Sequence, residues 1–299
     1  MKHLQEIVEA AQARGRKRLA VAYGQDSHTI EAVYDAYKEG LAEPILFGDK
    51  AVIEQVCAEL NIDSSVFTIV DEKNDVKAAT LAVKAVAEGE ADILMKGTLP
   101  TDKYMRAILN KEIGLCPPKA VLGHVSVFEW AGYHKLLLAS DIAIIPLPEF
   151  KQKISLIGYM AKVANALEIA TPKIGCIAAM ELVNPLPAMT EAAIISKMAD
   201  RGQLGNVIVD GPLSLDVALF KEVAEHKKVK GSAVAGDVDG LLFPNIESGN
   251  VFFKSVSHLA GGELAAVVMG AKVPCVLTSR GDSAASKKYS IALASLLAK

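Results

Sequence analysis

The sequence predicts an α/β fold of two domains with mixed, mostly parallel sheets. Short apolar runs alternate with amphipathic segments along most of the chain, and this pattern is typical of parallel strands covered by helices. A length of 299 residues suffices for two medium domains. The alternation is interrupted near residues 141–150 without a linker rich in Pro, Gly or Ser. We therefore expect two closely packed domains that share a cleft.

The first part of the chain predicts strand–helix units in regular order. A charged amphipathic segment opens the chain, and the basic cluster RGRKR (14–18) fits a helix end and turn better than a nucleic-acid site. A strand at LAVAY (19–23) precedes a helix that ends at Gly40. Further units are expected with strands at 44–48, 67–70 and 91–97 and helices at 75–88 and 101–110.

The middle of the chain predicts antiparallel strands before the alternation returns. Three apolar runs, at 119–130, 134–140 and 141–146, follow one another with only short turns. A long helix over about 150–167 comes next. Later strands are expected at 173–178, 206–212, 240–245, 265–270 and 273–279.

Composition excludes several functional classes. A net charge of −3 provides no basic field for nucleic acid or for an anionic membrane surface. The N-terminal segment lacks the uninterrupted apolar stretch of a secretory signal, and no later run is long enough for a membrane span, so we expect a cytoplasmic protein with small ligands. The cysteines are far apart and the histidines lack ligand spacing, which predicts reduced thiols and no metal. The cysteines are Cys57, Cys116, Cys176 and Cys275.

Candidate site residues lie in loops that follow predicted strands. In parallel sheets, ligands gather at the carboxyl ends of strands, where the N-termini of helices attract anions. The loops with suitable polar residues are KGTLPT (96–101), DGPLS (210–214), PNIESGN (244–250) and TSRGDS (278–283).

The loop TSRGDS predicts an anion site. Arg280 offers a planar fork suited to phosphate, and Gly281 permits close approach of the backbone. Asp282 or Ser283 can cap the helix that follows. The alternative is a plain helix cap beside a surface arginine.

The loop KGTLPT adds a second set of polar groups. Lys96, Thr98 and Thr101 precede or begin a helix that carries Arg106. Arg106 is either a phosphate ligand or a solvated helical arginine, and the residues alone leave both open.

Two asparagines are further candidates for ligand binding, and two common nucleotide-binding motifs are absent from the sequence. Asn245 and Asn250 bracket a Gly-containing turn and can bind an amide or a phosphate, although turn chemistry alone explains both. No GxGxxG follows an early strand and no GxxxxGK[ST] occurs. The residues alone thus predict a phosphate-handling α/β enzyme.

Longer segments resemble the phosphate acetyl/butyryl transferase family along nearly the whole chain. The resemblance is carried by LAVAYGQDSHTIEAVYDAYKEGLAEPILFGD (19–49), ADILMKGTLPTDKYMRAIL (91–109), HVSVFEW (124–130) and, above all, LLFPNIESGNVFFKSVSHLAGGELAAVVMGAKVPCVLTSRGDSAASKKYSIALA (241–294). That last block is more similar to the phosphate butyryltransferase branch than to the acetyl branch.

The resemblance implies a fold like that of isocitrate and isopropylmalate dehydrogenases, in which two α/β domains flank a cleft. Domain 1 would comprise residues 1–142 and 266–299 and carry the phosphate-site loops. Domain 2 would comprise residues 143–265, form a wall of the CoA cleft, and join the subunits of a homodimer or higher homo-oligomer.

The resemblance also implies reversible transfer of a short-chain acyl group between CoA and inorganic phosphate. The ligands would be acyl-CoA, CoA, phosphate and acyl phosphate, with no resident cofactor or metal and with butyryl or branched-chain groups preferred over acetyl. Arg280 and Arg106 would hold the phosphoryl group, and Ser279 would donate to the developing oxyanion or to the phosphate. The adenine end of CoA would contact DGPLS and PNIESGN.

The proton of the CoA thiol needs a further group. Acetyl-type relatives use an aspartate seven residues after the serine, and Ser286 stands there in this chain. We hypothesise that Asp282 acts as the base or orients the thiol, unless it only caps the helix. Ser283 and Ser286 are counted as substrate-binding residues. Cys116 and Cys275 lack features that lower a thiol pKa, which favours direct transfer in a ternary complex over an acyl-cysteine.

Two alternatives remain. A dehydrogenase of the same fold would need acidic metal ligands, but the spacing of the available aspartates matches no ligand pattern. These aspartates are Asp210, Asp216, Asp237 and Asp239. A non-catalytic protein that binds CoA or phosphate would keep the cleft without turnover, and the retained serine and arginines argue against it.

Overall fold

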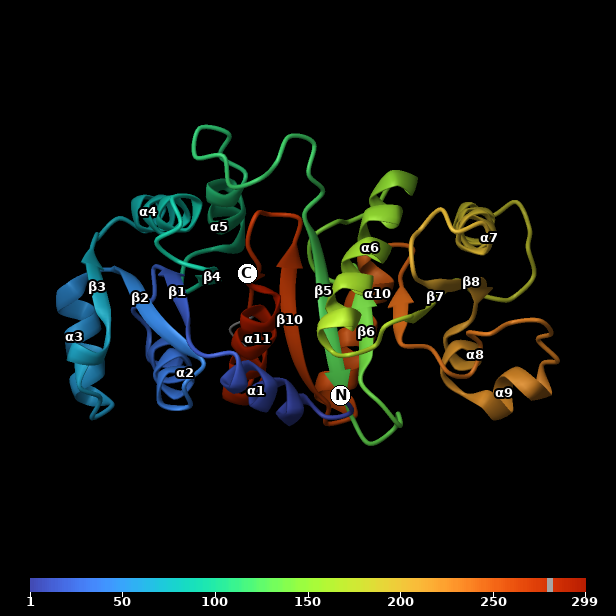
Figure 1. Ribbon diagram of the computed structural model, residues 1–299, viewed down its shortest axis with the longest axis horizontal. Helices are drawn as coiled ribbons and strands as arrows, with labels where there is room; N and C mark the ends of the chain where they lie inside the picture. The colour runs from blue at the N-terminus through green and yellow to red at the C-terminus, as the bar shows by residue number, and fades with distance from the viewer. Residues whose placement is uncertain (279–281) are drawn as a thin grey trace. The chain divides into compact units, whose positions relative to one another are not determined.

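The computed structural model describes residues 1–278 and 282–299 (Figure 1). The chain divides into two compact units, unit 1 (Met1–Leu4 and Val121–Leu264) and unit 2 (Gln5–Ala120 and Ala265–Lys299). Both units combine helices with mostly parallel strands, which confirms the predicted α/β class. The predicted domains, 1–142 with 266–299 and 143–265, differ from these units in the placement of segment 121–142, of Met1–Leu4 and of residue 265.

The strands of unit 2 follow the order β3-β2-β1-β4-β11-β10. Neighbours from β3 to β11 are parallel, whereas β10 is antiparallel to β11. The strands are β1 (Lys17–Ala22), β2 (Ala42–Gly48), β3 (Thr68–Asp71), β4 (Ile93–Lys96), β10 (Glu263–Met269), in which the chain passes from unit 1 into unit 2, and β11 (Cys275–Val276). The helices are α1 (Leu4–Ala13), α2 (Ser27–Lys38), α3 (Lys50–Glu59), α4 (Asp75–Ala87), α5 (Thr101–Ile108) and α11 (Ala284–Leu297), with a short 3-10 helix at Ser64–Val66.

Local sequence signals set the ends of the helices that matter for the site. Asp26 caps α2, because its carboxylate accepts a hydrogen bond from the amide of Thr29 (3.1 Å). Ser283 caps α11 by accepting from the amide of Ser286 (2.9 Å). Gly40 follows α2 with φ 74°, a conformation that glycine adopts without strain. The predicted end of this helix is therefore confirmed.

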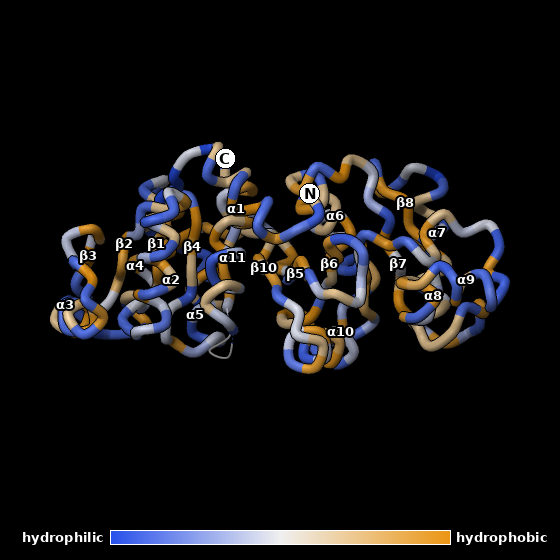
Figure 2. Tube along the Cα trace, turned by 90° about the horizontal axis from the view of Figure 1, so that it is seen from below, coloured by the Kyte–Doolittle hydropathy of each residue, from blue (hydrophilic) through white to orange (hydrophobic). Residues whose placement is uncertain are grey.

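Helices cover the strands of unit 2 in two groups. α2 packs against α3 and α11, whereas α4 packs against α5. Figure 1 shows these groups on opposite sides of β1 and β2. The strand β4, between β1 and β11, is wholly apolar up to its last residue, and Ile93, Leu94 and Met95 are 0% exposed. Figure 2 shows β4 in hydrophobic colours, as expected for a parallel strand covered on both faces.

The strands of unit 1 follow the order β5-β6-β9-β7-β8. β5 and β6 are antiparallel and the other neighbours are parallel. The strands are β5 (Gly123–Glu129), β6 (Leu137–Ser140), β7 (Lys173–Ile177), β8 (Ile208–Leu213) and β9 (Gly240–Leu242). The helices are α6 (Phe150–Ala166), α7 (Pro187–Asp200), α8 (Leu215–Leu219), α9 (Lys221–His226) and α10 (Ile246–Lys254), with a π-helical turn at Ser255–Leu259. In Figure 1, α7 lies above β7 and β8, and α8 and α9 lie below them.

The prediction of three antiparallel strands is confirmed for the first two runs and wrong for the third. Residues 141–146 form no strand, because the carboxylate of Asp141 accepts hydrogen bonds from the amides of Ala143 and Ile144 (both 2.8 Å). A side chain that binds the backbone two and three residues ahead stabilises a turn. Asp141 is 1% exposed and also accepts from the amide of His124 (2.9 Å), so its carboxylate serves the fold.

No helix in the described part of the chain combines the length and apolar character needed to cross a lipid bilayer.

Candidate active site

A pocket of about 440 Å³ lies in unit 2 at the carboxyl ends of β1, β4 and β11. These strands are adjacent and parallel, so the connections that follow them meet at one edge of the sheet. The N-termini of α2 and α11 lie at the same edge. The volume falls within the range of about 300–1,000 Å³ that is usual for small-molecule sites. The lining residues of this unit 2 pocket are Asp26, His28, Thr29, Lys96, Gly97, Thr98, Thr278 and Lys287.

Asp26 joins two of the connections that line the pocket. Its carboxylate accepts from the amide of Thr29 at the start of α2 and from Oγ1 of Thr98 (2.7 Å) after β4. Burial raises the pKa of Asp26, but the hydrogen bonds from Thr29 and Thr98 outweigh burial and hold this pKa below its usual value. Asp26 is therefore an ionised, fixed acceptor at neutral pH.

The turn after β4 is held tightly against the turn after β1. The amide of Gly97 donates to the carbonyl of Ala22 (2.9 Å). A β-carbon at Gly97 would lie only 2.3 Å from the carbonyl oxygen of Tyr23, so this contact requires glycine. Nζ of Lys96 donates to the carbonyls of Gly97 (3.0 Å) and Leu99 (3.3 Å). The lysine thereby places a buried positive charge at the base of the turn, with its residue 7% exposed.

Lys287 supplies a second ammonium group. It lies in the first turn of α11, where its amide donates to the carbonyl of Ser283 (3.1 Å), and it is 7% exposed. Within residues 1–278 and 282–299 its side chain makes no hydrogen bond and no ion pair. Together with Lys96 it outweighs the single carboxylate of Asp26, so the described lining of the pocket favours an anion.

Two of the predicted site residues, Lys96 and Thr98, line this pocket. The predicted catalytic residues Ser279 and Arg280 lie outside the described residues. Sequence reasoning therefore located the β4 side of the pocket, and its assignments on the loop before α11 stay predictions.

The three predicted residues at the start of α11 do not line the pocket. Asp282 is half-buried and Ser283 is exposed, and Ser283 rather than Asp282 caps the helix. Ser286 is 4% exposed, and its amide donates to Oγ of Ser283. A helix cap thus accounts for Ser283, whereas the role proposed for Asp282 stays a prediction.

Two further predicted residues lie on α5. Thr101 is exposed at the first position of the helix. The side chain of Arg106 is 81% exposed, and its Nη2 lies 3.7 Å from a carboxylate oxygen of Asp102. This is the geometry of a solvated helical arginine, and a phosphate contact of Arg106 stays a prediction.

The predicted asparagines belong to unit 1 and take part in its fold. Oδ1 of Asn245 accepts from the amide of Ser248 (2.9 Å) and caps α10. Nδ2 of Asn250 donates to the carbonyl of Ile142 (3.2 Å). Both side-chain amides therefore stabilise the backbone around α10.

Sequence reasoning missed most residues of the unit 2 pocket. Asp26, His28 and Thr29 belong to a helix start directly after a predicted strand, so the placement rule that found Lys96 also applies to them. Lys287 gave no such signal, because a lysine in the first turn of a helix is expected to be solvated.

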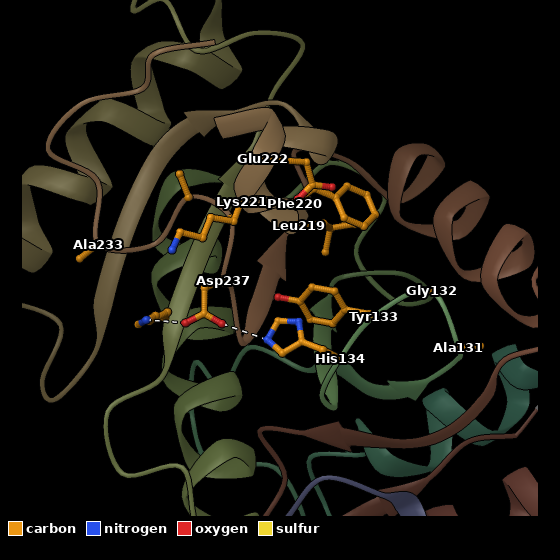
Figure 3. Close-up of a pocket in the computed structure, with 13 residues that line it drawn as sticks. Ala131, Gly132, Tyr133, His134, Leu219, Phe220, Lys221, Glu222, Ala233 and Asp237 are labelled. Carbon is orange, nitrogen blue, oxygen red and sulfur yellow. Dashed lines mark hydrogen bonds and ion pairs between the residues drawn. The ribbon is translucent and has the colours of Figure 1, made fainter. Parts of the chain in front are cut away.

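A second pocket, of about 730 Å³, lies in unit 1 at the amino ends of β7 and β9 (Figure 3). Asp237, in its lining, is surrounded by cationic groups. Asp237 accepts from Nζ of Lys173 (2.6 Å), lies 2.8 Å from Nζ of Lys135, and contacts Nε2 of His134 (3.2 Å). Burial raises the pKa of Asp237, but Lys135 and Lys173 outweigh it and lower this pKa to about 2. Lys135 and Asp239, which pair with each other (2.7 Å), lie outside the lining, so the one aspartate of this unit 1 pocket is neutralised by Lys173 in the lining and by Lys135 beside it.

Comparisons of sequence support the expected family. The chain matches the family Phosphate acetyl/butaryl transferase over residues 2–81 and 73–295. It is 44% identical over 299 residues to the phosphate butyryltransferase of Clostridium acetobutylicum, covering 100% of this chain and 99% of the relative. It is 42% identical over 296 residues to the phosphate acetyltransferase of Thermotoga maritima, covering 99% of each.

Comparisons of structure agree. A branched-chain phosphotransacylase from Enterococcus faecalis V583 matches with a TM-score of 0.79 and 28% identity, covering 94% of this chain and 99% of that chain. A 4-hydroxythreonine-4-phosphate dehydrogenase from Klebsiella pneumoniae matches with a TM-score of 0.56 and 13% identity, covering 93% and 98%, a likeness of fold alone. The resemblance inferred from sequence is thus confirmed, and the chain belongs to the phosphate acetyl/butaryl transferase family.

Proposed function

We propose that this protein is a phosphate acyltransferase that moves a short-chain acyl group between CoA and inorganic phosphate. The observation that carries the proposal is the unit 2 pocket, whose buried lysines outweigh its carboxylate, in a chain similar over its full length to phosphate butyryl- and acetyltransferases. Its ligands are acyl-CoA, CoA, phosphate and acyl phosphate. It uses CoA as a substrate and needs no resident cofactor or metal.

The reaction moves one acyl group and one proton. An oxygen of HPO₄²⁻ attacks the carbonyl carbon of the thioester, a C–O bond forms, and the C–S bond breaks. The proton of the phosphate passes to the sulfur of CoA, so the products are acyl phosphate and free thiol. The site must therefore bind the phosphate, stabilise the oxyanion and relay the proton. We assign phosphate binding to Arg280, with Arg106, and oxyanion donation to Ser279.

We assign the relay of the proton to Asp282. Asp282→Asn is expected to lower kcat by about 10²-fold or more, as is usual for the loss of a general acid or base. Full turnover in this variant would exclude Asp282 from the chemistry. Ser283→Ala, which removes the neighbouring helix cap, is the matched control for effects on α11 alone.

The cysteines support direct transfer in a ternary complex. Burial raises the pKa of Cys116 and of Cys275, and it raises the pKa of Cys176 to about 12. The thiolate is the nucleophile, so each of these shifts makes an acyl-cysteine less accessible at neutral pH. Incubation with radiolabelled acyl-CoA alone should therefore leave no stable label on the protein, and stable labelling would contradict direct transfer.

The preferred acyl group is proposed to be butyryl or branched-chain. The identities to a butyryltransferase and to an acetyltransferase, 44% and 42%, lie too close together to decide, so the choice is experimental. The test is phosphate-dependent release of CoA thiol from acetyl-, propionyl-, butyryl- and isobutyryl-CoA. We expect turnover that requires phosphate, ranks butyryl- or isobutyryl-CoA first, and collapses in Arg280→Ala. Binding of CoA without turnover of any substrate would favour the non-catalytic alternative.

The dehydrogenase alternative gains no support from its proposed ligands. Asp237 and Asp239 are held by Lys135, and Asp216 lies 3.1 Å from Nζ of Lys227. The finer predictions also remain part of this proposal. They are the isocitrate dehydrogenase-like division into residues 1–142 with 266–299 and residues 143–265, the homodimer, and the cytoplasmic location.

A further inference from the structure

Lys287 occupies an electrostatically unfavourable position. It lies in the first turn of α11, where the helix dipole presents its positive end and disfavours a cation. The residue is 7% exposed, so most of its side chain is out of water, and a cation in such a place is stabilised by a partner of opposite charge. Within the described residues the side chain has no such partner, and it lies in the wall of the unit 2 pocket.

The neighbouring charges show how lysines in this unit are otherwise accommodated. Lys288, the next residue of α11, lies 3.0 Å from a carboxylate oxygen of Glu39. Lys96, on the other side of the same pocket, donates to two backbone carbonyls. The one carboxylate in the lining, Asp26, is bound by Thr29 and Thr98 rather than by Lys287. The contacts among residues 1–278 and 282–299 therefore give no structural reason for a cation at residue 287.

We propose that Lys287 binds the phosphate substrate, as HPO₄²⁻ in one direction and as the phosphoryl group of acyl phosphate in the other. This inference rests on the proposed function, to which it adds a residue that contacts substrate. A dianion in the unit 2 pocket would form an ion pair with Lys287. Its second negative charge would help to compensate the positive charge of Lys96. It would also turn the dipole of α11 from a penalty into a stabilising term. A neutral ligand would leave the buried charge uncompensated.

The test is direct binding of inorganic phosphate by calorimetry, without acyl-CoA. Lys287→Gln keeps most of the side-chain length and removes the charge, and the loss of one charge-assisted hydrogen bond is expected to raise the Kd for phosphate about 10- to 100-fold. Lys288→Gln, on the same helix turn, is the matched control and should leave this Kd within about twofold. Lys287→Arg, which keeps the positive charge, should recover part of the affinity.

A second ligand separates the possible sources of phosphate groups. CoA carries phosphates of its own, so the same variants are titrated with CoA. We expect the Kd for CoA to stay within about twofold in Lys287→Gln. An unchanged Kd for phosphate, or a rise in the Kd for CoA alone, would overturn the inference. If Lys287→Gln does not give a native circular dichroism spectrum, Lys287→Met repeats the titration with an apolar side chain of similar length.

The binding test and the turnover test can contradict the two proposals independently of each other. An enzyme that turns over acyl-CoA, while Lys287→Gln binds phosphate normally, contradicts this inference and leaves the proposed function intact. A protein that binds phosphate through Lys287 but turns over none of the acyl-CoA substrates contradicts the function and leaves the site.

Discussion

The two pockets differ in how their charged side chains are paired. In the unit 1 pocket, Asp237 is paired with Lys173 of the lining and with Lys135 beside it. In the unit 2 pocket, Lys287 meets no carboxylate of the described residues. The paired pocket is the larger, at about 730 Å³ against about 440 Å³. Our proposal rests on a charge without a described structural partner rather than on volume, since folding alone would select against such a charge.

The largest effect on stability is expected at Gly97 in the lining of the unit 2 pocket, where there is no space for a β-carbon. Gly97→Ala places a β-carbon 2.3 Å from the carbonyl oxygen of Tyr23, so the backbone must shift. We expect the free energy of unfolding to fall by about 2–3 kcal/mol, with a matching loss of turnover.

Gly158→Ala in α6 is the matched control, because a β-carbon there meets nothing within 4 Å. It should raise the free energy of unfolding by up to about 1 kcal/mol, since alanine favours the helix. The free energy of unfolding is measured by denaturant unfolding, and turnover by initial rates. If both quantities were the same in the two variants, the close contact between Gly97 and Tyr23 would not be needed for stability or turnover.

The free energy of unfolding is expected to change in opposite directions when a lysine paired beside the unit 1 pocket and the lysine of the unit 2 pocket are neutralised. Lys135→Gln removes a partner of Asp237 and Asp239 and should lower the free energy of unfolding by about 1–2 kcal/mol. Lys287→Gln removes a charge that has no partner among the described residues and should raise the free energy of unfolding by about 0.5–1 kcal/mol in phosphate-free buffer. Chemical denaturation of both variants in the same buffer measures the contrast, and a loss of stability in both would break the comparison.

A smaller effect is expected from the pH dependence of the unit 1 pocket. The pKa of Asp237 is lowered to about 2, below the roughly 3.9 of an unfolded chain. The stabilisation by its ion pairs is therefore fully present above about pH 4 and is lost as the pH falls through about 2. Because its side chain is 44% exposed, screening limits this contribution to about 1 kcal/mol. Asp237→Asn should remove it, so the difference in Tm from the unmodified protein should vanish towards pH 2. A difference that persists at pH 2 would contradict the ion-pair origin.

The smallest effect is expected at the thiol that is least buried. Cys116 is half-buried, and burial raises its pKa. Cys116→Ala should keep kcat within about twofold, because direct transfer needs no protein thiolate. A hundredfold loss in the initial rate, with native stability, would instead indicate covalent catalysis.

The sequence predicts what depends on neighbours along the chain. The alternation of apolar runs and amphipathic segments predicted β1 to within two residues, and Gly40 predicted the end of α2. Lys96 was found because it lies at the end of a predicted strand. The run at 141–146 was misjudged because the turn formed by Asp141 competes with its apolar character. The burial of Lys287 was unpredictable, since it follows from the packing of α11 against α2, segments about 250 residues apart in the sequence.

The central claim is that the unpaired lysine, and not the paired ones, binds phosphate in an acyltransferase. The most direct test is the initial rate as a function of phosphate concentration at saturating butyryl-CoA, for the unmodified protein, Lys287→Gln and Lys173→Gln. We predict that KM for phosphate rises at least about tenfold in Lys287→Gln and stays unchanged in Lys173→Gln. The same KM for phosphate in all three proteins would contradict the claim.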